Sequence, residues 1–350
     1  MSEHELRQRN LARLETEYFD GPVILALGAG VSQGSGLPTW HEILERLAER
    51  RWPSEGQAIL AALFRSGYSL PAVAGILEGS CSSAEEFTLW LREEIYHGFP
   101  FYRTELTREN QAAFLNHMNS NKTLGAVAAF CVAKAGPDYI RNPNVQAVFN
   151  FNFDALFREF VHHRFGNSIL RTIDRPSAGA MSARIPVYHM HGYLQFDSRK
   201  IGDLTSEAPD VRVLTEHEYF DFFNRSTTIY NYSFLHHLRE ASCVFIGLSM
   251  RDDNIRRLLH YSRRERVESD LREGHALAQA EHNSIRHYAL LKQSVARIDA
   301  LTELTLKRLG VRVIWYSDHE LIPAILHSVY QSRGEWSDVY DQGGQTDKPN

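Results

Sequence analysis

Short apolar runs, each followed by a turn and then by a helical pattern, recur along the chain. The run "PVILALG" (22–28) is continuously apolar and ends at glycine, which is typical of a buried parallel strand. The next segment, "TWHEILERLAERR" (39–51), repeats apolar residues at helical spacing, with Thr39 as its expected N-cap. Strand, turn and helix together make half of a βαβ unit.

The same theme recurs four more times. Predicted strands begin the segments 144–161, 241–262 and 309–330, and a further one occupies 184–194. Recurring strand–turn–helix units predict an α/β fold with a doubly wound, Rossmann-like parallel sheet.

The remaining segments complete the predicted domain organisation. We expect an N-terminal helix over 1–20 and a Rossmann-like domain over 21–51 and 141–335. The segment 52–140 has helical patterns with repeated Pro and Gly breakers, and is expected to form a helical insertion or cap. The polar, Gly-rich stretch 336–350 is expected to be a flexible tail.

Charge and hydropathy exclude several function classes. The formal net charge is −5, and Lys and Arg are dispersed. A dedicated nucleic-acid binder usually has a basic stripe, so we expect no direct nucleic-acid binding. No apolar run approaches the ~18–20 residues of a membrane helix, and the N-terminus is too polar for a signal peptide. We therefore expect a soluble, cytoplasmic protein with no membrane segment.

The cysteines and histidines are not spaced as metal ligands. Cys81, Cys131 and Cys243 are far apart and form no C-x-x-C pair. This excludes a four-cysteine zinc site, and three unpaired cysteines fit a reducing compartment better than a disulfide scaffold. The histidine pairs at 162–163 and 236–237 lack convergent ligand spacing nearby. We expect neither zinc nor any other metal.

The turn after the first strand, "GAGVSQGSGLP", consists mainly of residues with small side chains. It lies at the carboxyl end of the strand, which is where parallel sheets bind their ligands. Glycines let the backbone approach a pyrophosphate closely, and the following helix directs its N–H groups at the anion. The run departs from G-x-G-x-x-G because position 33 is Gln, and it lacks the G-K-[ST] of a Walker motif. For the G-x-G alone, a tight turn without a ligand remains an alternative.

With its continuation, the motif "GAGVSxxSGLPTW" resembles the first motif of the sirtuin family. Further motifs of that family follow in the expected order, and together they span residues 23 to about 325. They are "NFNFD" with Asn150, Asn152 and Asp154, "HMHGYL" with His191, and "IGLSMRDDN" with Gly247 and Ser249. The resemblance implies that the Rossmann-like domain binds NAD.

The matching positions imply roles for individual residues. Asn152 and His191 would be catalytic, because an Asn amide can position water or a ribose hydroxyl and a His can act as a general base. We favour His191 over His189 because glycine follows it. The residues expected to bind NAD are Gly28, Ala29, Gly30, Ser32, Ser35, Asn150, Asp154, Gly247 and Ser249. For Asp154, capping of its own helix is an equal alternative, and Asp252 and Asp253 are expected to cap the helix from about Asn254.

The chain departs from the protein deacetylases of the family. It cannot build their four-cysteine zinc module, and Pro38-Thr39-Trp40-His41 replaces their Pro-Asp-Phe-Arg. The strand that clamps an acetyl-lysine peptide is not recognisable. These departures are similar to those of prokaryotic anti-phage sirtuin-like proteins. That resemblance implies an NAD hydrolase that uses NAD as its substrate and cleaves the nicotinamide–ribose bond.

The resemblance also implies regulation, because an enzyme that depletes NAD must be silent in healthy cells. We expect a homo-oligomer, and either a defence partner chain or a nucleotide signal as activator. A HerA-like ATPase and an Argonaute-type protein are the partner chains considered. Two other functions remain open: a non-catalytic module that senses NAD or ADP-ribose, and a deacylase or ADP-ribosyl transferase that uses the same pocket.

Overall fold

A seven-stranded sheet lies at the centre of the molecule. The computed structural model describes residues 3–133, 145–166, 169–173, 185–196, 213–224 and 228–332. The strand order is β3-β4-β2-β1-β5-β6-β7, and every neighbouring pair is parallel. The strands are β1 (Val23–Leu27), β2 (Val145–Asn150), β3 (Leu170–Ile173), β4 (Ile185–His189), β5 (Ser242–Ile246), β6 (His287–Lys292) and β7 (Val311–Tyr316). The predicted doubly wound, Rossmann-like α/β class is confirmed.

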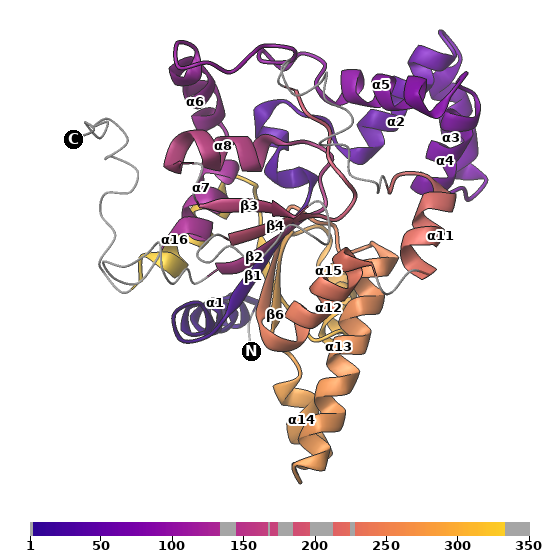
Figure 1. Ribbon diagram of the computed structural model, residues 1–350. Coiled ribbons are helices and arrows are strands. Elements are labelled where there is room, and N and C mark those ends of the chain that lie inside the picture. The colour runs from indigo at the N-terminus through magenta and orange to yellow at the C-terminus, as the bar shows by residue number, and fades with distance from the viewer. Residues whose placement is uncertain are drawn as a thin grey trace.

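Helices cover both faces of this sheet (Figure 1). Successive side chains of a strand point to opposite faces, so Leu25 of β1 enters one core and Ile24 the other. The core of Leu25 lies under α1 (Glu3–Asp20), α7 (Lys122–Val132), α8 (Leu156–Phe165) and α16 (Leu321–Tyr330). The core of Ile24 lies under α12 (Ile229–Glu240), α13 (Asp253–Arg272) and α15 (Ala296–Lys307).

The chain between β1 and β2 is helical, as predicted. Before α7 it forms α2 (Trp40–Arg51), α3 (Gly56–Arg65), α4 (Leu70–Gly79), α5 (Ala84–Ile95) and α6 (Gln111–Ser120). Helices α2 to α5 lie together at one side of the sheet in Figure 1. In contrast, α7 packs against α16, α8 and β2, and its apolar residues belong to the main core. The predicted domain boundaries stay a prediction.

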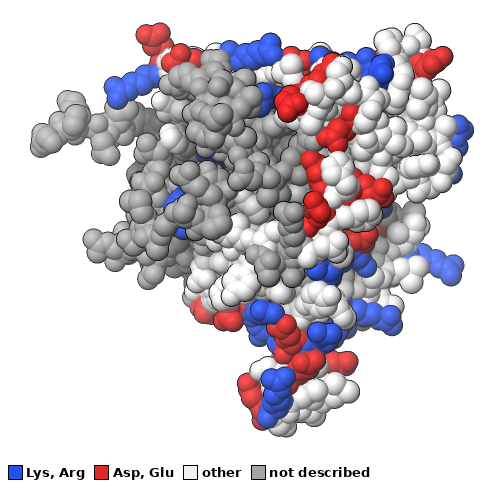
Figure 2. Space-filling view, turned by 45° about the vertical axis from the view of Figure 1, so that its right-hand side comes forward, with Lys and Arg blue, Asp and Glu red and all other residues white. Residues whose placement is uncertain are grey.

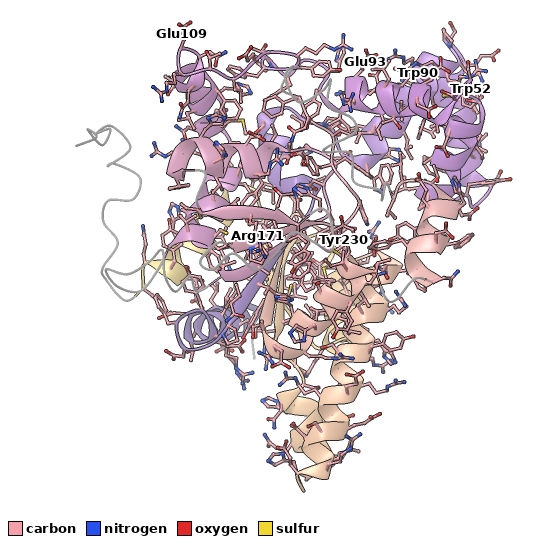
Figure 3. All side chains as sticks on the ribbon, viewed as in Figure 1. Trp52, Trp90, Glu93, Glu109, Arg171 and Tyr230 are labelled. Atoms are coloured by element: carbon pink, nitrogen blue, oxygen red, sulfur yellow. The ribbon has the colours of Figure 1, made fainter. Side chains whose placement is uncertain are left out.

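Local sequence signals explain how this helical group begins and holds together. The Thr39 hydroxyl accepts from the Glu42 backbone N–H, and the Glu42 carboxylate accepts from Thr39 N–H at 2.6 Å. This capping box confirms Thr39 as the N-cap of α2. Arg50 joins α2 to α5 by an ion pair with Glu93 at 2.8 Å and by lying over the Trp90 ring (Figure 3).

Charged side chains of both signs are interspersed along the upper and lower edges of the face in Figure 2. No helix within the described ranges is long and apolar enough to cross a membrane. The tail predicted at 336–350 lies outside the described residues.

Candidate functional site

The turns that follow β1 and β5 are joined at the centre of the sheet. The chain first builds β2 to β4 on one side of β1 and later places β5 on the other side. The carboxyl ends of β1 and β5 therefore mark the topological switch point, where doubly wound sheets bind ligands. Gly28 N–H donates to Ile246 O at 2.9 Å, and Gly30 N–H donates to Gly247 O at 3.1 Å.

This close approach explains why the turn after β1 is rich in glycine. A Cβ atom on Gly28 would lie 2.5 Å from Gly247 O, and one on Gly30 would lie 2.8 Å from Gly247 Cα. Gly247 itself has a φ of 71°, a conformation that favours glycine. Contact between the two turns therefore requires these glycines. Their contribution to binding pyrophosphate stays a prediction.

Gly28→Ala is expected to lower the free energy of unfolding by about 3 kcal/mol, because the backbone of Gly247 cannot move away without disturbing β5. Gly79→Ala is the matched control, since a Cβ there meets nothing within 4 Å. Gly79 ends α4, so Ala at that position is expected to be neutral or to add up to about 1 kcal/mol. Urea denaturation measures both. Equal stability of Gly28→Ala and wild type would contradict the described contact.

Asn121 holds the first turn from the helical side. Its Nδ2 donates to Val31 O at 2.8 Å and to Ser35 Oγ at 2.9 Å, while its Oδ1 accepts from Leu124 N–H at the start of α7. Ser35 is buried and bonded to protein, and its predicted contact with NAD is not tested. The sequence marks Asn121 only as a helix cap. Its bonds to the turn join residues 86 and 90 positions apart, which no local pattern reveals.

Asn152 is anchored beside the same turn. Only 6% of it is exposed, and its Nδ2 donates to Gly28 O at 3.0 Å and to Ser32 Oγ at 3.4 Å. Its backbone N–H donates to Oδ1 of the buried Asn150 at 3.1 Å. Within the described ranges, Asn152 Oδ1 accepts no hydrogen bond. One end of the amide is thus fixed and the other remains available as an acceptor.

His191 lies against the segment that carries Asn152. Its ring packs edge-on to Phe151, with centroids 5.3 Å apart, and hydrogen bonds to the Phe151 backbone. Its Nε2 is buried and has no partner among the residues described. Burial lowers the pKa of His191, and this shift is opposed by Asp252 and by the Phe151 backbone. A neutral ring that donates through Nδ1 leaves Nε2 as the proton acceptor.

His189 has different surroundings. It is 2% exposed, and its ring lies 4.2 Å from that of Tyr193. Neither of its ring nitrogens has a hydrogen-bond partner in the described part of the chain. Burial, with help from Arg158, lowers the pKa of His189 to about 3. Such a weakly basic ring is poorly suited to general base catalysis near neutral pH.

Asp154 is buried and bonds to the protein at the start of α8, whereas its contact with NAD stays a prediction. Its Oδ1 accepts from Leu156 N–H at 2.9 Å at the start of α8, and its carboxylate also bonds with the Ser32 hydroxyl. Ser32 therefore links Asp154 to Asn152. Burial raises the pKa of Asp154 from 3.8 to about 6, against the effect of these hydrogen bonds.

The raised pKa of Asp154 predicts a pH dependence of stability. The folded protein binds this proton more tightly than the unfolded chain, so the free energy of unfolding falls as the pH rises from about 4 to about 6. Asp154→Asn removes this pH dependence. Between pH 4 and 6 its free energy of unfolding is expected to rise by up to about 3 kcal/mol relative to that of the wild type. Urea denaturation across the interval measures the difference. Asp253→Asn, at the exposed start of α13, is the control, and identical pH profiles for all three proteins would contradict the assignment.

Two tyrosines secure the strand ends and cover the site. Tyr96, at the end of α5, accepts from Ala155 N–H at 3.0 Å and donates to Leu194 O at 2.6 Å, which ties the segments after β2 and β4 together. Tyr219 lies on α11 (Glu216–Asn224), 6.2 Å from the His191 ring between centroids, and its hydroxyl bonds to Asp252. Neither tyrosine lies in a sequence motif, so neither could be singled out from the sequence.

The turn after β5 completes the arrangement. Asp252 caps α13 by accepting from Ile255 N–H at 2.8 Å, as predicted. Ser249 is exposed beside this cap, whereas Ala29 and Gly30 in the opposite turn are half-buried. The structure therefore gathers Asn152, His191 and the two turns at one edge of the sheet.

Possible metal ligands lie elsewhere. Asp270, Glu273 and His275 have ligand atoms within 4.8 Å of one another, at the end of α13 away from the turns. The three cysteines are free and lie on separate parts of the fold: Cys81 after α4, Cys131 in α7 and Cys243 in β5.

Comparison with known proteins identifies a family for the part of the chain that begins at β2. Curated proteins gave no match to the chain. Residues 146–314 match the family model of the SIR2-like domain. The matched range carries Asn152, His191 and Ser249, while the first glycine turn precedes it. The SIR2-like family uses NAD. Residues 146–314 are thus a SIR2-like domain, and this domain points to a function that involves NAD.

Proposed function

We propose that the protein is an NAD glycohydrolase that releases nicotinamide and ADP-ribose. The supporting observation is His191, a buried histidine with an unpartnered Nε2, which lies against the segment of Asn152 within a SIR2-like domain. Among the residues that the structure describes, the other buried histidines do not combine a fixed tautomer with a neighbouring anchored amide at strand carboxyl ends. His189, for example, has no hydrogen bond within this part of the chain to fix its tautomer.

The residues at the strand ends fit a dinucleotide. Buried polar atoms without partners in the described chain, His191 Nε2 and Asn150 Nδ2, are suited to ribose hydroxyls. In this proposal the pyrophosphate lies along the glycine turns, near the exposed Ser249. When bound, NAD supplies a glycosidic bond whose leaving group, nicotinamide, departs as a neutral molecule.

The protein's own groups then have distinct tasks. Asn152 is held through Nδ2, so its Oδ1 can orient a water or a ribose hydroxyl. His191 accepts a proton at Nε2 from that hydroxyl or water. Water adds to the anomeric carbon of the ribose, and the electron pair of the broken C–N bond stays with nicotinamide. Cleavage of this kind develops positive charge on the ribose, which nearby oxygen acceptors stabilise.

We further propose that the enzyme rests in a closed state and depletes NAD in anti-phage defence when it is activated. Tyr219 and Phe222 of α11 both pack against His191, which is only 8% exposed. The same helix reaches the helical insertion, where His217 lies 4.0 Å from Glu78 of α4. A homo-oligomer contact, a HerA-like ATPase, an Argonaute-type protein or a nucleotide signal would act by displacing this cover.

The direct test is to incubate the purified protein with NAD, without any peptide, and to separate the products by chromatography. Release of nicotinamide and ADP-ribose in equal amounts is expected of a glycohydrolase. If calorimetry detects NAD binding but no product forms, the assay is repeated in extracts of phage-infected cells. Binding without cleavage under both conditions would replace the proposal with an NAD sensor.

A further inference from the structure

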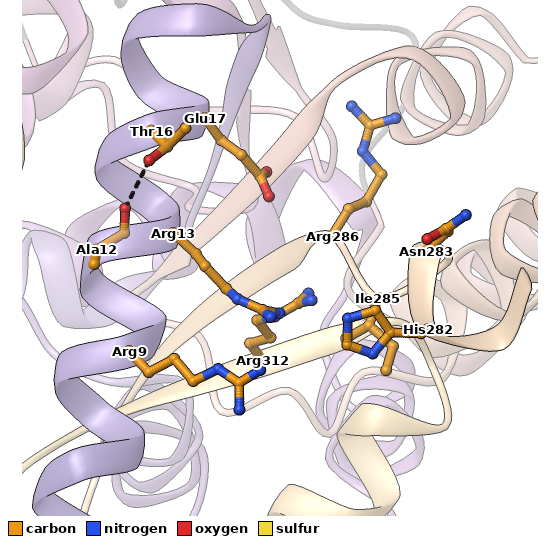
Figure 4. Close-up of a pocket in the computed structure, with 10 residues that line it drawn as sticks. All are labelled: Arg9, Ala12, Arg13, Thr16, Glu17, His282, Asn283, Ile285, Arg286 and Arg312. Carbon is orange, nitrogen blue, oxygen red and sulfur yellow. Dashed lines mark hydrogen bonds between the residues drawn. The ribbon is translucent and has the colours of Figure 1, made fainter. Parts of the chain in front are cut away.

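A second concave site lies on the opposite edge of the sheet from Asn152 and His191. It is a cavity of about 490 Å³ between α1, the end of α14 (Leu277–Asn283), the segment just before β6 and the start of β7 (Figure 4). The strands are parallel, so their amino ends meet at this edge and their carboxyl ends at the other. We call it the arginine pocket, after Arg9, Arg13, Arg286 and Arg312 in its lining.

The positive charge of the arginine pocket is only partly offset, because four arginines line it with a single carboxylate, Glu17. Arg9 and Arg13 are one turn apart on α1, on the side that faces Arg312 (Figure 4). None of these three takes part in an ion pair within the described chain. The pocket's one acidic lining residue, Glu17, instead accepts hydrogen bonds from the hydroxyls of Tyr288, at 2.8 Å, and Ser242.

The arginines are held close enough to influence one another. Arg312 Nη1 is buried and has no hydrogen-bond partner among the residues that the structure describes. Burial lowers the pKa of Arg312, and Arg13 and Arg9 lower it further, against the effects of Tyr288 and Glu17. His282, which also lines the pocket, has its pKa lowered by burial and then by Arg13, Arg312 and Arg9. Four arginines against the single carboxylate of Glu17 leave the lining with a net positive charge, which favours an anionic ligand.

We propose that the arginine pocket binds the phosphate groups of a small phosphorylated ligand, such as a nucleotide. Guanidinium groups bind phosphate oxygens through paired N–H donors, and here those of α1 and β7 lie together. Arg286, in the segment before β6, instead donates to Arg239 O, Glu240 O and Ser242 Oγ. The cavity lies within the range of about 300–1,000 Å³ typical of small-molecule sites. Buried Ile285 and the small Ala12 give it an apolar part of its lining.

The test uses binding, so its outcome does not depend on NAD cleavage. Tripolyphosphate and ATP serve as probes in titration calorimetry, in a chloride buffer free of phosphate. Arg9→Gln/Arg13→Gln changes two side chains of a surface helix and keeps residues that favour helix. Its control, Arg65→Gln/Arg108→Gln, removes the same charge from two exposed sites outside the pocket. Arg312→Gln is a second, independent variant from β7.

Both probes are expected to bind wild type and the control equally, and to bind each pocket variant at least about tenfold more weakly. Binding of ATP alone would assign the site to nucleotides, whereas binding of both probes would show that phosphate groups suffice. Unchanged binding in folded pocket variants would overturn the proposal. So would the absence of binding by either probe to wild type.

Discussion

Asn152→Ala is expected to reduce the release of nicotinamide from NAD at least about 100-fold. The substitution removes the only part of the residue that can orient water or a ribose hydroxyl, the Oδ1 atom that is fixed through the bond from Nδ2 to Gly28 O. The measurement is product release under saturating NAD, followed by chromatography. If the proposed role is correct, kcat falls more than KM rises, because the contact matters most in the transition state.

The loss of turnover in Asn152→Ala must be distinguished from the effect of a loss of folded structure. Asn152→Ala also removes two hydrogen bonds to the first turn, so a decrease in stability of about 1 kcal/mol is expected. Asn110→Ala is the matched control, because the described hydrogen bonds of the Asn110 side chain go to Thr107 and Glu105 in a turn before α6. A folded Asn152→Ala protein that retains wild-type turnover would remove Asn152 from the proposed mechanism.

His191→Ala is expected to lower kcat by about 10² to 10⁴, the usual contribution of a general base. The reason is the loss of Nε2, the buried ring atom without a partner in the described chain. The pH profile gives a second readout, because the acidic limb of the wild-type rate should reflect protonation of this ring. Burial lowers the pKa of His191, so the rate should hold to a pH below the ordinary range of histidine.

His189→Leu is the informative comparison for His191. Both ring nitrogens of His189 are buried without partners among the residues described, which costs free energy that an apolar side chain avoids. The variant is therefore expected to keep its turnover and to be no less stable than wild type. Loss of activity in His189→Leu, with activity retained in His191→Ala, would exchange the roles of the two histidines.

The fold could be predicted from the sequence where each strand is apolar and ends in a distinctive turn. That description fits β1, β2, β4, β5 and β7, and all five were expected. Two strands were not. β3 has four residues, of which only Ile173 is buried, and β6 begins with His287 and ends with the exposed Lys292. Both are positioned by pairing with a neighbour, β3 with β4 and β6 with β7, which is information that a short local pattern does not contain.

The central residues of the candidate site could be predicted from the sequence, but the residues that hold them in place could not. The resemblance to sirtuin motifs singled out Asn152 and His191, and strand ends in a parallel sheet meet at one edge, so the two could be placed together. Their surroundings depend on contacts between distant segments. Tyr96 bonds to residues 59 and 98 positions away, and Tyr219 bonds to Asp252 across 33 positions. Such contacts are fixed by packing of the whole fold, and single residues do not reveal them.

The position of Asn121 and Tyr96 bears on the modularity of this protein. Both residues belong to the stretch between β1 and β2, which from its sequence resembles an insertion. Asn121 nevertheless holds the first glycine turn, and Tyr96 ties the segments after β2 and β4 together. Excision of the whole stretch would remove two anchors of the site along with the helices. A shortened protein, or a chimera with another sheet of this type, must therefore retain both residues and can be trimmed only between them or before Tyr96.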